Sequence, residues 1–196
     1  MELNDLQQQR LAKLERLRAA GIDPYPPRAE RSHTIAAVLQ SFDDLAARTE
    51  RVTLVGRIVG ARRVMGKLAF AHIEDGSAKI QLWLSKADLG DEWFARFRDD
   101  IDTFDIVQAT GTLRRTKTGE ASLFVEQLVL LSKALNPPPE KWHGLSDVEA
   151  RLRERYLDLI VNEEVRTVFR TRARIITAVR HFLDGRGCER LCAPLR

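Results

Sequence analysis

The stretch that decides the fold is residues 62–83, RRVMGKLAFAHIEDGSAKIQLW. It contains two runs of strand-forming residues joined at Glu74-Asp75-Gly76-Ser77. An Asp-Gly pair between two such runs is a strong hairpin signal, so we expect two adjacent strands here. The hairpin brings cations, an aromatic ring and a side-chain amide into one small region, which is the chemistry needed to read an unpaired base.

Alternation along the two strands predicts which side chains face outward. The aliphatic residues at alternate positions of 80–84 are expected to face the core, which turns Gln81 outward. On the preceding strand the same logic leaves Phe70 and His72 on the outward face beside Gln81. A base could then stack on Phe70 while the Gln81 amide, a donor and an acceptor, pairs with its Watson–Crick edge. The alternative interpretation is that Phe70 only packs against its neighbours, as aromatic residues on strands commonly do.

Between residues 51 and 133 the pattern has the two-residue period of strands. Strands are expected at Val52–Val64, Lys67–Glu74, Ala78–Ser85, Ile106–Arg115 and Ser122–Leu131, with a helix over Asp91–Asp100 after the third. Five strands with a helix after the third match the OB fold, an all-β five-stranded Greek-key barrel. Gly56 and Gly60 in the long first strand suit the bend that such a small barrel requires.

The last two predicted strands are joined at Thr116-Lys117-Thr118-Gly119, a natural turn sequence. With Arg114 and Arg115 before it, this turn places three cations at one rim of the barrel, and Lys67 follows the first strand. We regard Lys67, Arg114, Arg115 and Lys117 as candidate phosphate contacts. OB folds commonly bind oligonucleotides through the second and third strands and the flanking loops, so the arrangement predicts nucleic-acid binding.

Helices are expected on both sides of the barrel, which makes the chain α+β overall. The segment Glu2–Ala20 has the period of an amphipathic basic helix, whose cations we interpret first as a solvated face and second as phosphate contacts. Ser32–Ala47 predicts a short helical connector. After the rigid Asn136-Pro137-Pro138-Pro139 linker, helical patterns cover Leu145–Ile160 and Glu163–Leu183, and the apolar positions of the last helix have no local partner to cover them.

These patterns divide the chain into four segments: a helical extension over 1–50, the OB-fold domain over 51–133, a linker with a helix over 134–162, and the start of a further domain over 163–196.

Composition narrows the class of protein further. The 196 residues are 44% hydrophobic, with 32 basic and 28 acidic side chains and a net charge of +4. No apolar run approaches a membrane span and the N-terminus is not a secretory signal, so we expect a cytoplasmic protein that does not bind membranes. Cys188 and Cys192 have no ligand cluster around them, and no arrangement of side chains indicates a metal site or a catalytic group.

Five strings in order resemble the N-terminal part of class II lysyl-tRNA synthetases. They are Gly21-Ile22-Asp23-Pro24-Tyr25-Pro26, Arg63-Val64-Met65-Gly66-Lys67, Arg115-Thr116-Lys117-Thr118-Gly119-Glu120, Lys141-Trp142-His143-Gly144-Leu145 and Arg155-Tyr156-Leu157-Asp158-Leu159-Ile160. The resemblance implies that the barrel binds the anticodon of a lysine tRNA. It implies that Phe70 stacks on the middle anticodon uridine, that Gln81 and Arg63 form hydrogen bonds near it, and that Glu120 lies near the first anticodon base.

The resemblance also implies what this chain does not contain. The second and third class II motifs, which bind ATP and magnesium in the full-length family, have no counterpart in the 196 residues. We therefore expect a tRNA-reading part truncated before the catalytic core, with no cofactor of its own, inactive alone as a ligase and not forming the family homodimer stably. Two alternatives stay open at this point: a stand-alone module that binds tRNA or single strands, and a nonfunctional remnant.

Overall fold

The structure is a computed structural model that describes residues 4–137 and 147–187. It separates into two compact units, Met1–Pro138 and Pro139–Arg196, which are described one at a time below. The four-segment division of the sequence stays a prediction. Pro138 and Pro139 of the expected linker, the string 141–145, and Cys188 and Cys192 lie outside the described residues.

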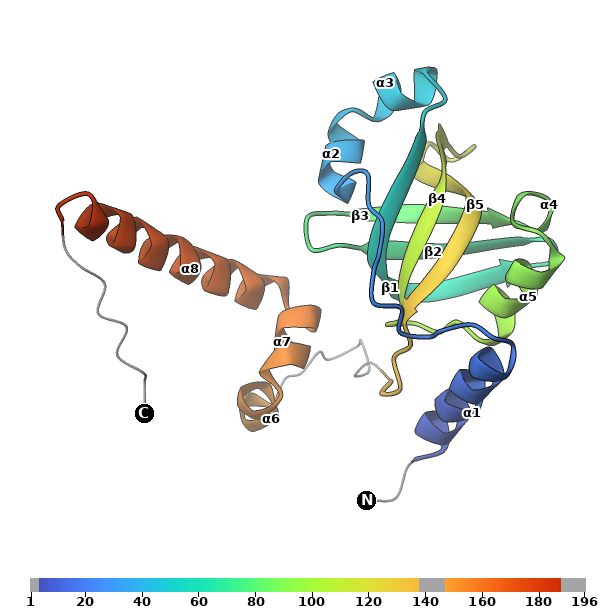
Figure 1. The fold of residues 1–196 in the computed structure, drawn as a ribbon, viewed down its shortest axis with the longest axis horizontal. Coiled ribbons are helices and arrows are strands. Elements are labelled where there is room, and N and C mark those ends of the chain that lie inside the picture. Colours follow the sequence, from blue (N-terminus) through green and yellow to red (C-terminus); the bar gives the residue numbers. More distant parts are fainter. Residues whose placement is uncertain (1–3, 138–146, 188–196) are drawn as a thin grey trace. The chain divides into compact units, whose positions relative to one another are not determined.

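The first unit is built on a closed β-barrel, which confirms the predicted OB fold (Figure 1). Its strands are β1 (Arg51–Met65), β2 (Leu68–Glu74), β3 (Lys79–Ser85), β4 (Ile106–Arg115) and β5 (Ala121–Ser132). Around the barrel they follow the order β1-β2-β3-β5-β4, with β3 and β5 parallel and every other pair antiparallel.

Burial in the barrel follows the two-residue period of the sequence. Along β2 and β3 every second side chain is buried, and the inward set includes Ile73 and Leu82. Phe70, His72 and Gln81 therefore point outward, as predicted. The long β1 pairs with β4 through its first half and with β2 through its second, and its register shifts between Val59 and Arg63. Gly60 lies in that irregular stretch with φ +72°, a conformation that favours glycine, so the predicted bend is present.

Four short helices surround the barrel core: α2 (Ile35–Gln40), α3 (Phe42–Ala47), α4 (Lys86–Leu89) and α5 (Asp91–Asp99). Phe94 and Phe97 of α5 and Ile35 of α2 are buried in a hydrophobic cluster that they share with the inward side chains of the barrel. The connector expected as one helix over Ser32–Ala47 is two helices that meet at Ser41.

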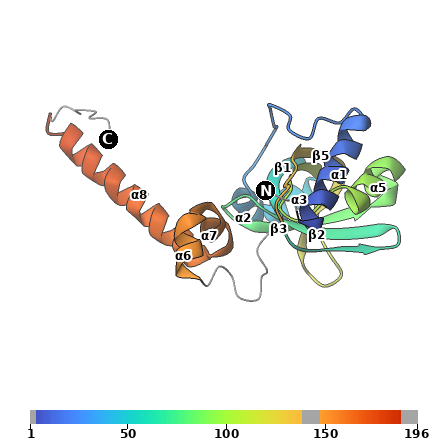
Figure 2. The same cartoon turned by 90° about the horizontal axis from the view of Figure 1, so that it is seen from below.

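Helix α1 (Asp5–Ala19) packs beside α5, as both cartoon views show (Figures 1 and 2). It begins with a capping box between Asn4 and Gln7. Leu14 and Leu17 are buried as its period predicts, whereas Leu6 is exposed.

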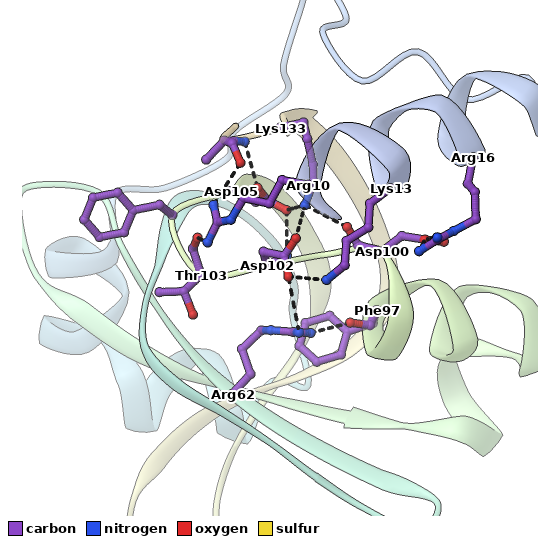
Figure 3. Close-up of polar contacts among 12 residues, drawn as sticks. Arg10, Lys13, Arg16, Arg62, Phe97, Asp100, Asp102, Thr103, Asp105 and Lys133 are labelled. Carbon is purple, nitrogen blue, oxygen red and sulfur yellow. Dashed lines mark hydrogen bonds and ion pairs between the residues drawn. The ribbon is translucent and has the colours of Figure 1, made fainter. Parts of the chain in front are cut away.

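The interpretation of the α1 cations as a solvated face was wrong for Arg10 and Lys13, whereas Arg16 stays more than half exposed although it forms an ion pair (Figure 3). The Arg10 guanidinium is buried and donates to the carbonyl oxygens of Thr103 at 3.1 Å and Ala134 at 2.8 Å. Lys13 and Arg16 form ion pairs with Asp102 and Asp100, at 2.5 and 2.7 Å. These cations attach α1 to the loop between α5 and β4, which carries the matching acidic groups.

At the centre of this network lies Lys133, whose side chain is completely buried. Its Nζ lies 2.6 Å from a carboxylate oxygen of Asp102 and 2.8 Å from one of Asp105. Burial raises the pKa of Asp105 above its ordinary value. Burial would also raise the pKa of Asp102, but hydrogen bonds from Lys13 and Lys133 and their charges hold that pKa below its ordinary value.

The second unit contains α6 (Val148–Arg153), α7 (Arg155–Val161) and α8 (Glu163–Asp184). The helix expected over Leu145–Ile160 is thus two helices, with Leu145 outside the described residues. Asp158 is buried and paired with Arg151 and Arg155. One face of α8 is apolar and exposed, in line with the sequence pattern. Its members include Val168, Ile175, Val179 and Phe182.

The substitution Lys133→Ala should destabilise the barrel strongly, by about 3–5 kcal/mol, because it leaves buried carboxylates without their cation. Chemical denaturation monitored by tryptophan fluorescence measures the free energy of unfolding. The control Lys67→Ala removes an exposed lysine and should change it by no more than about 0.5 kcal/mol. Equal losses in the two variants would contradict the role given to Lys133.

The substitution Lys13→Ala should destabilise the first unit in a pH-dependent way. The pKa of Asp102 is lower in the folded than in the unfolded chain, so its ion pair adds stability above the unfolded pKa and loses it as pH falls. We expect a difference from wild type of about 1 kcal/mol above roughly pH 5, shrinking below roughly pH 4 as Asp102 is protonated. Unfolding curves measured across this range test it, and a difference that does not change with pH would mean that Lys13 acts through packing alone.

Candidate nucleic-acid interface

A cleft of about 440 Å³ opens on the outer face of the barrel beside β2 and β3. Four of its lining residues are the ones predicted to bind the anticodon: Arg63, Phe70, Gln81 and Glu120. The remaining lining residues are Ala61, Met65, His72 and Thr118. The structure thus brings together side chains from the end of β1, from both strands of the hairpin and from the β4–β5 turn.

The Glu120 carboxylate connects the polar side chains of the cleft. Its Oε1 lies 2.8 Å from Nε2 of His72, and its Oε2 accepts a hydrogen bond of 2.7 Å from Nε2 of Gln81. The other end of the Gln81 amide, Oε1, accepts a hydrogen bond of 2.7 Å from the hydroxyl of Ser122. Three neighbouring strands and one turn therefore supply a single chain of hydrogen bonds.

The position of Glu120 follows from the predicted turn. Gly119 has φ +83°, and the backbone N–H of Glu120 donates to Oγ1 of Thr116 at 3.1 Å. The N–H of Thr116 in turn donates to the carbonyl of Glu120 at 3.0 Å. A glycine at the left-handed position lets the chain reverse tightly, which directs the next side chain back over the sheet.

A row of rings crosses the outer face of the barrel next to the cleft. Phe70 meets Trp83 edge to face, with centroids 4.8 Å apart and planes at 87°, and Trp83 stacks on Phe124 at 5.0 Å. The Arg114 guanidinium lies 5.1 Å from the centroid of Phe124. Phe70 therefore does pack against a neighbour, as the alternative interpretation held, and it also lines the cleft.

The candidate phosphate contacts differ in whether their charged groups already contact other side chains. Lys67 and Lys117 are exposed near the turns that flank the cleft. Arg114 lies over Phe124, and Arg115 lies over the ring of Phe42 while pairing with Asp43 at 3.0 Å. The rim predicted from the sequence exists, but part of its charge is neutralised.

Sequence reasoning missed Phe124 as a member of this surface and the buried Ser122 as the partner of Gln81, and it gave His72 no role. Phe124 lies between buried Leu123 and Val125, so the alternation of β5 contained the signal that it faces outward. That Ser122 and Phe124 lie beside Gln81 and Trp83 depends on the parallel β3–β5 pairing, which joins distant parts of the chain. Local pattern alone does not determine such a pairing.

Within residues 4–137 and 147–187, no group of three or more His, Cys, Asp and Glu side chains is placed to hold a metal ion. Over the same residues, no helix has the length and hydropathy of a membrane span.

Comparison with known proteins assigns the two parts of the chain to known families. Residues 52–131 match the model of the OB-fold nucleic acid binding domain, and residues 147–195 match that of the class II tRNA synthetases for D, K and N. The lysine–tRNA ligase of Roseiflexus sp. (strain RS-1) is 74% identical over 187 residues, covering 95% of this chain and 38% of that protein.

More distant relatives show the same pattern of coverage. The lysine–tRNA ligase of Chloroflexus aurantiacus is 70% identical over 195 residues, covering 100% of this chain and 40% of the relative. The lysine–tRNA ligase of Pelotomaculum thermopropionicum is 46% identical over 194 residues, covering 99% of this chain and 38% of that protein.

The barrel and its matching family model define an OB-fold nucleic-acid-binding domain. With the segment that follows it, the chain belongs to the class II lysyl-tRNA synthetase family. It spans well under half the length of the relatives it matches.

Proposed function

We propose that the barrel binds the anticodon of a lysine tRNA and that the cleft receives its bases. The observation that carries this proposal is that one cleft contains Arg63, Phe70, Gln81 and Glu120, the residues that the family resemblance implies for anticodon binding. They come from separate strands and a turn, and Glu120 reaches Gln81 from 39 residues further along the chain, beyond the hairpin that brings the others together.

The chemistry of the cleft suits an unpaired uridine. The Phe70 ring offers a surface on which a base can stack, and an edge-to-face contact with Trp83 holds that ring in place. The Gln81 amide offers a donor and an acceptor to a Watson–Crick edge. Arg63 is exposed and lines the cleft, where its charge suits a phosphate or a base carbonyl.

For the whole protein we propose the activity that the name of its relatives states, the ligation of lysine to tRNA. This reaction would be driven by ATP with magnesium. We assign no group in these 196 residues to ATP or magnesium. The similarity extends through residues 147–195 and not only through the barrel, which speaks against a stand-alone single-strand-binding module or a remnant.

Removing the stacking surface should weaken binding of the anticodon. We expect Phe70→Ala to reduce affinity for an anticodon stem-loop with the sequence UUU by about 5- to 150-fold, because stacking of one base contributes roughly 1–3 kcal/mol. Fluorescence anisotropy titration measures the dissociation constant. The control Phe182→Ala removes an exposed phenylalanine of α8 and should leave affinity unchanged. Wild-type protein that binds all anticodons equally would contradict the proposed function.

Removing a free cation should change the salt dependence of binding. Lys117→Ala is expected to weaken binding to every stem-loop alike and to lower the slope of log affinity against log salt by about 0.7–1. Arg115→Ala should lower this slope less, because Asp43 already neutralises part of the Arg115 charge. Titrations at several salt concentrations compare the two slopes. A larger change for Arg115→Ala would mean that RNA displaces Asp43 and uses the arginine instead.

A further inference from the structure

The Gln81 amide has only part of its hydrogen-bonding capacity left for a ligand. A primary amide has two N–H donors and two lone pairs on its oxygen. One donor binds Glu120 Oε2 at 2.7 Å, and one lone pair accepts from the Ser122 hydroxyl at 2.7 Å. One N–H and one lone pair therefore remain. The orientation of the amide fixes the order in which this donor and this acceptor face a ligand.

Glu120 determines that order. An ionised carboxylate only accepts hydrogen bonds, so rotating the Gln81 amide by half a turn would place the amide oxygen against a carboxylate oxygen. Ser122 does not oppose this rotation, because a hydroxyl can donate or accept. The direction of the amide is consequently held from the Glu120 side.

Glu120 needs a second contact to act in this way. It lies at the end of a surface turn, with 45% of its side chain exposed, so its carboxylate competes with water for its partners. His72 supplies the second contact, since its Nε2 lies 2.8 Å from Oε1 of Glu120. Because that oxygen only accepts, Nε2 carries the hydrogen.

We propose that His72 is a positioning residue for base selection. It holds the Glu120 carboxylate, which fixes the direction of the Gln81 amide and thereby the base edge that the cleft accepts. This inference rests on the proposed anticodon function and adds to it a residue that does not itself need to touch the base.

The base edges concerned are those of the two pyrimidines. Uracil presents the N3–H donor beside a carbonyl acceptor, whereas cytosine presents the N3 acceptor beside an amino donor, so the two edges have opposite order. An amide fixed in one direction pairs with only one of them. An amide that can rotate adapts to both, so loss of His72 should reduce discrimination more than it reduces affinity for uridine.

The test uses two anticodon stem-loops that differ only in U or C at the middle anticodon position, titrated against the full chain. We expect His72→Ala to reduce the preference for U over C by about 3- to 10-fold, the loss typical of one hydrogen bond. His72→Gln, whose side-chain amide offers a donor toward Glu120, should restore most of the preference. The matched control is His33→Ala, because His33 contacts Ser32 and does not line the cleft.

A second measurement needs no RNA. In wild type the side-chain amide protons of Gln81 should have chemical shifts away from those of a free glutamine, because one of them is held against Glu120. In His72→Ala these shifts should move toward the free values. Equal binding of both stem-loops by wild type would overturn the proposed function, and this inference with it. A wild-type preference for U that His72→Ala leaves unchanged, with unchanged Gln81 signals, would overturn the inference alone.

Discussion

The parallel pairing of β3 with β5 is the constraint on which the rest of the binding surface depends. It places Gln81 opposite Ser122 and Trp83 opposite Phe124. Parallel neighbours need a long connection, and here α4, α5 and β4 provide it. A register shift of one residue would turn Ser122 and Phe124 into the barrel and remove their contacts with β3. Closure of the barrel and assembly of the cleft are therefore one structural event.

The ion pairs beneath α1 serve a different purpose from the polar groups of the cleft. Burying the Lys133 ammonium carries a large desolvation cost, which Asp102 and Asp105 offset through direct contacts. Asp102 of the same loop also forms an ion pair with Lys13, so the charges on α1 hold the helix in place. In the cleft, by contrast, Glu120 remains partly exposed and its partners stay available to a ligand. Charge is used for assembly at one site, and we propose that it is used for recognition at the other.

Much of the barrel follows from local sequence. Alternation correctly turned Phe70 and Gln81 outward, and the Asp75-Gly76 and Thr116–Gly119 turns lie where their residues predicted. Two features depend on partners distant in sequence and were not predictable in this way. The cations of α1 bind carboxylates about 90 residues away, and Phe124 joins the aromatic row only through the parallel pairing. The roles of the site residues toward RNA remain predictions.

The most direct test of the central claim is to map where RNA contacts the protein. Backbone amide NMR spectra of the full chain, titrated with a UUU anticodon stem-loop, report on every segment at once. Anticodon binding in the cleft predicts that the largest shifts fall on residues 61–72, on Gln81 and on the 116–122 turn, with a stem-loop of unrelated anticodon producing much smaller ones. Shifts concentrated on α1 or α8, or equal for both RNAs, would contradict it.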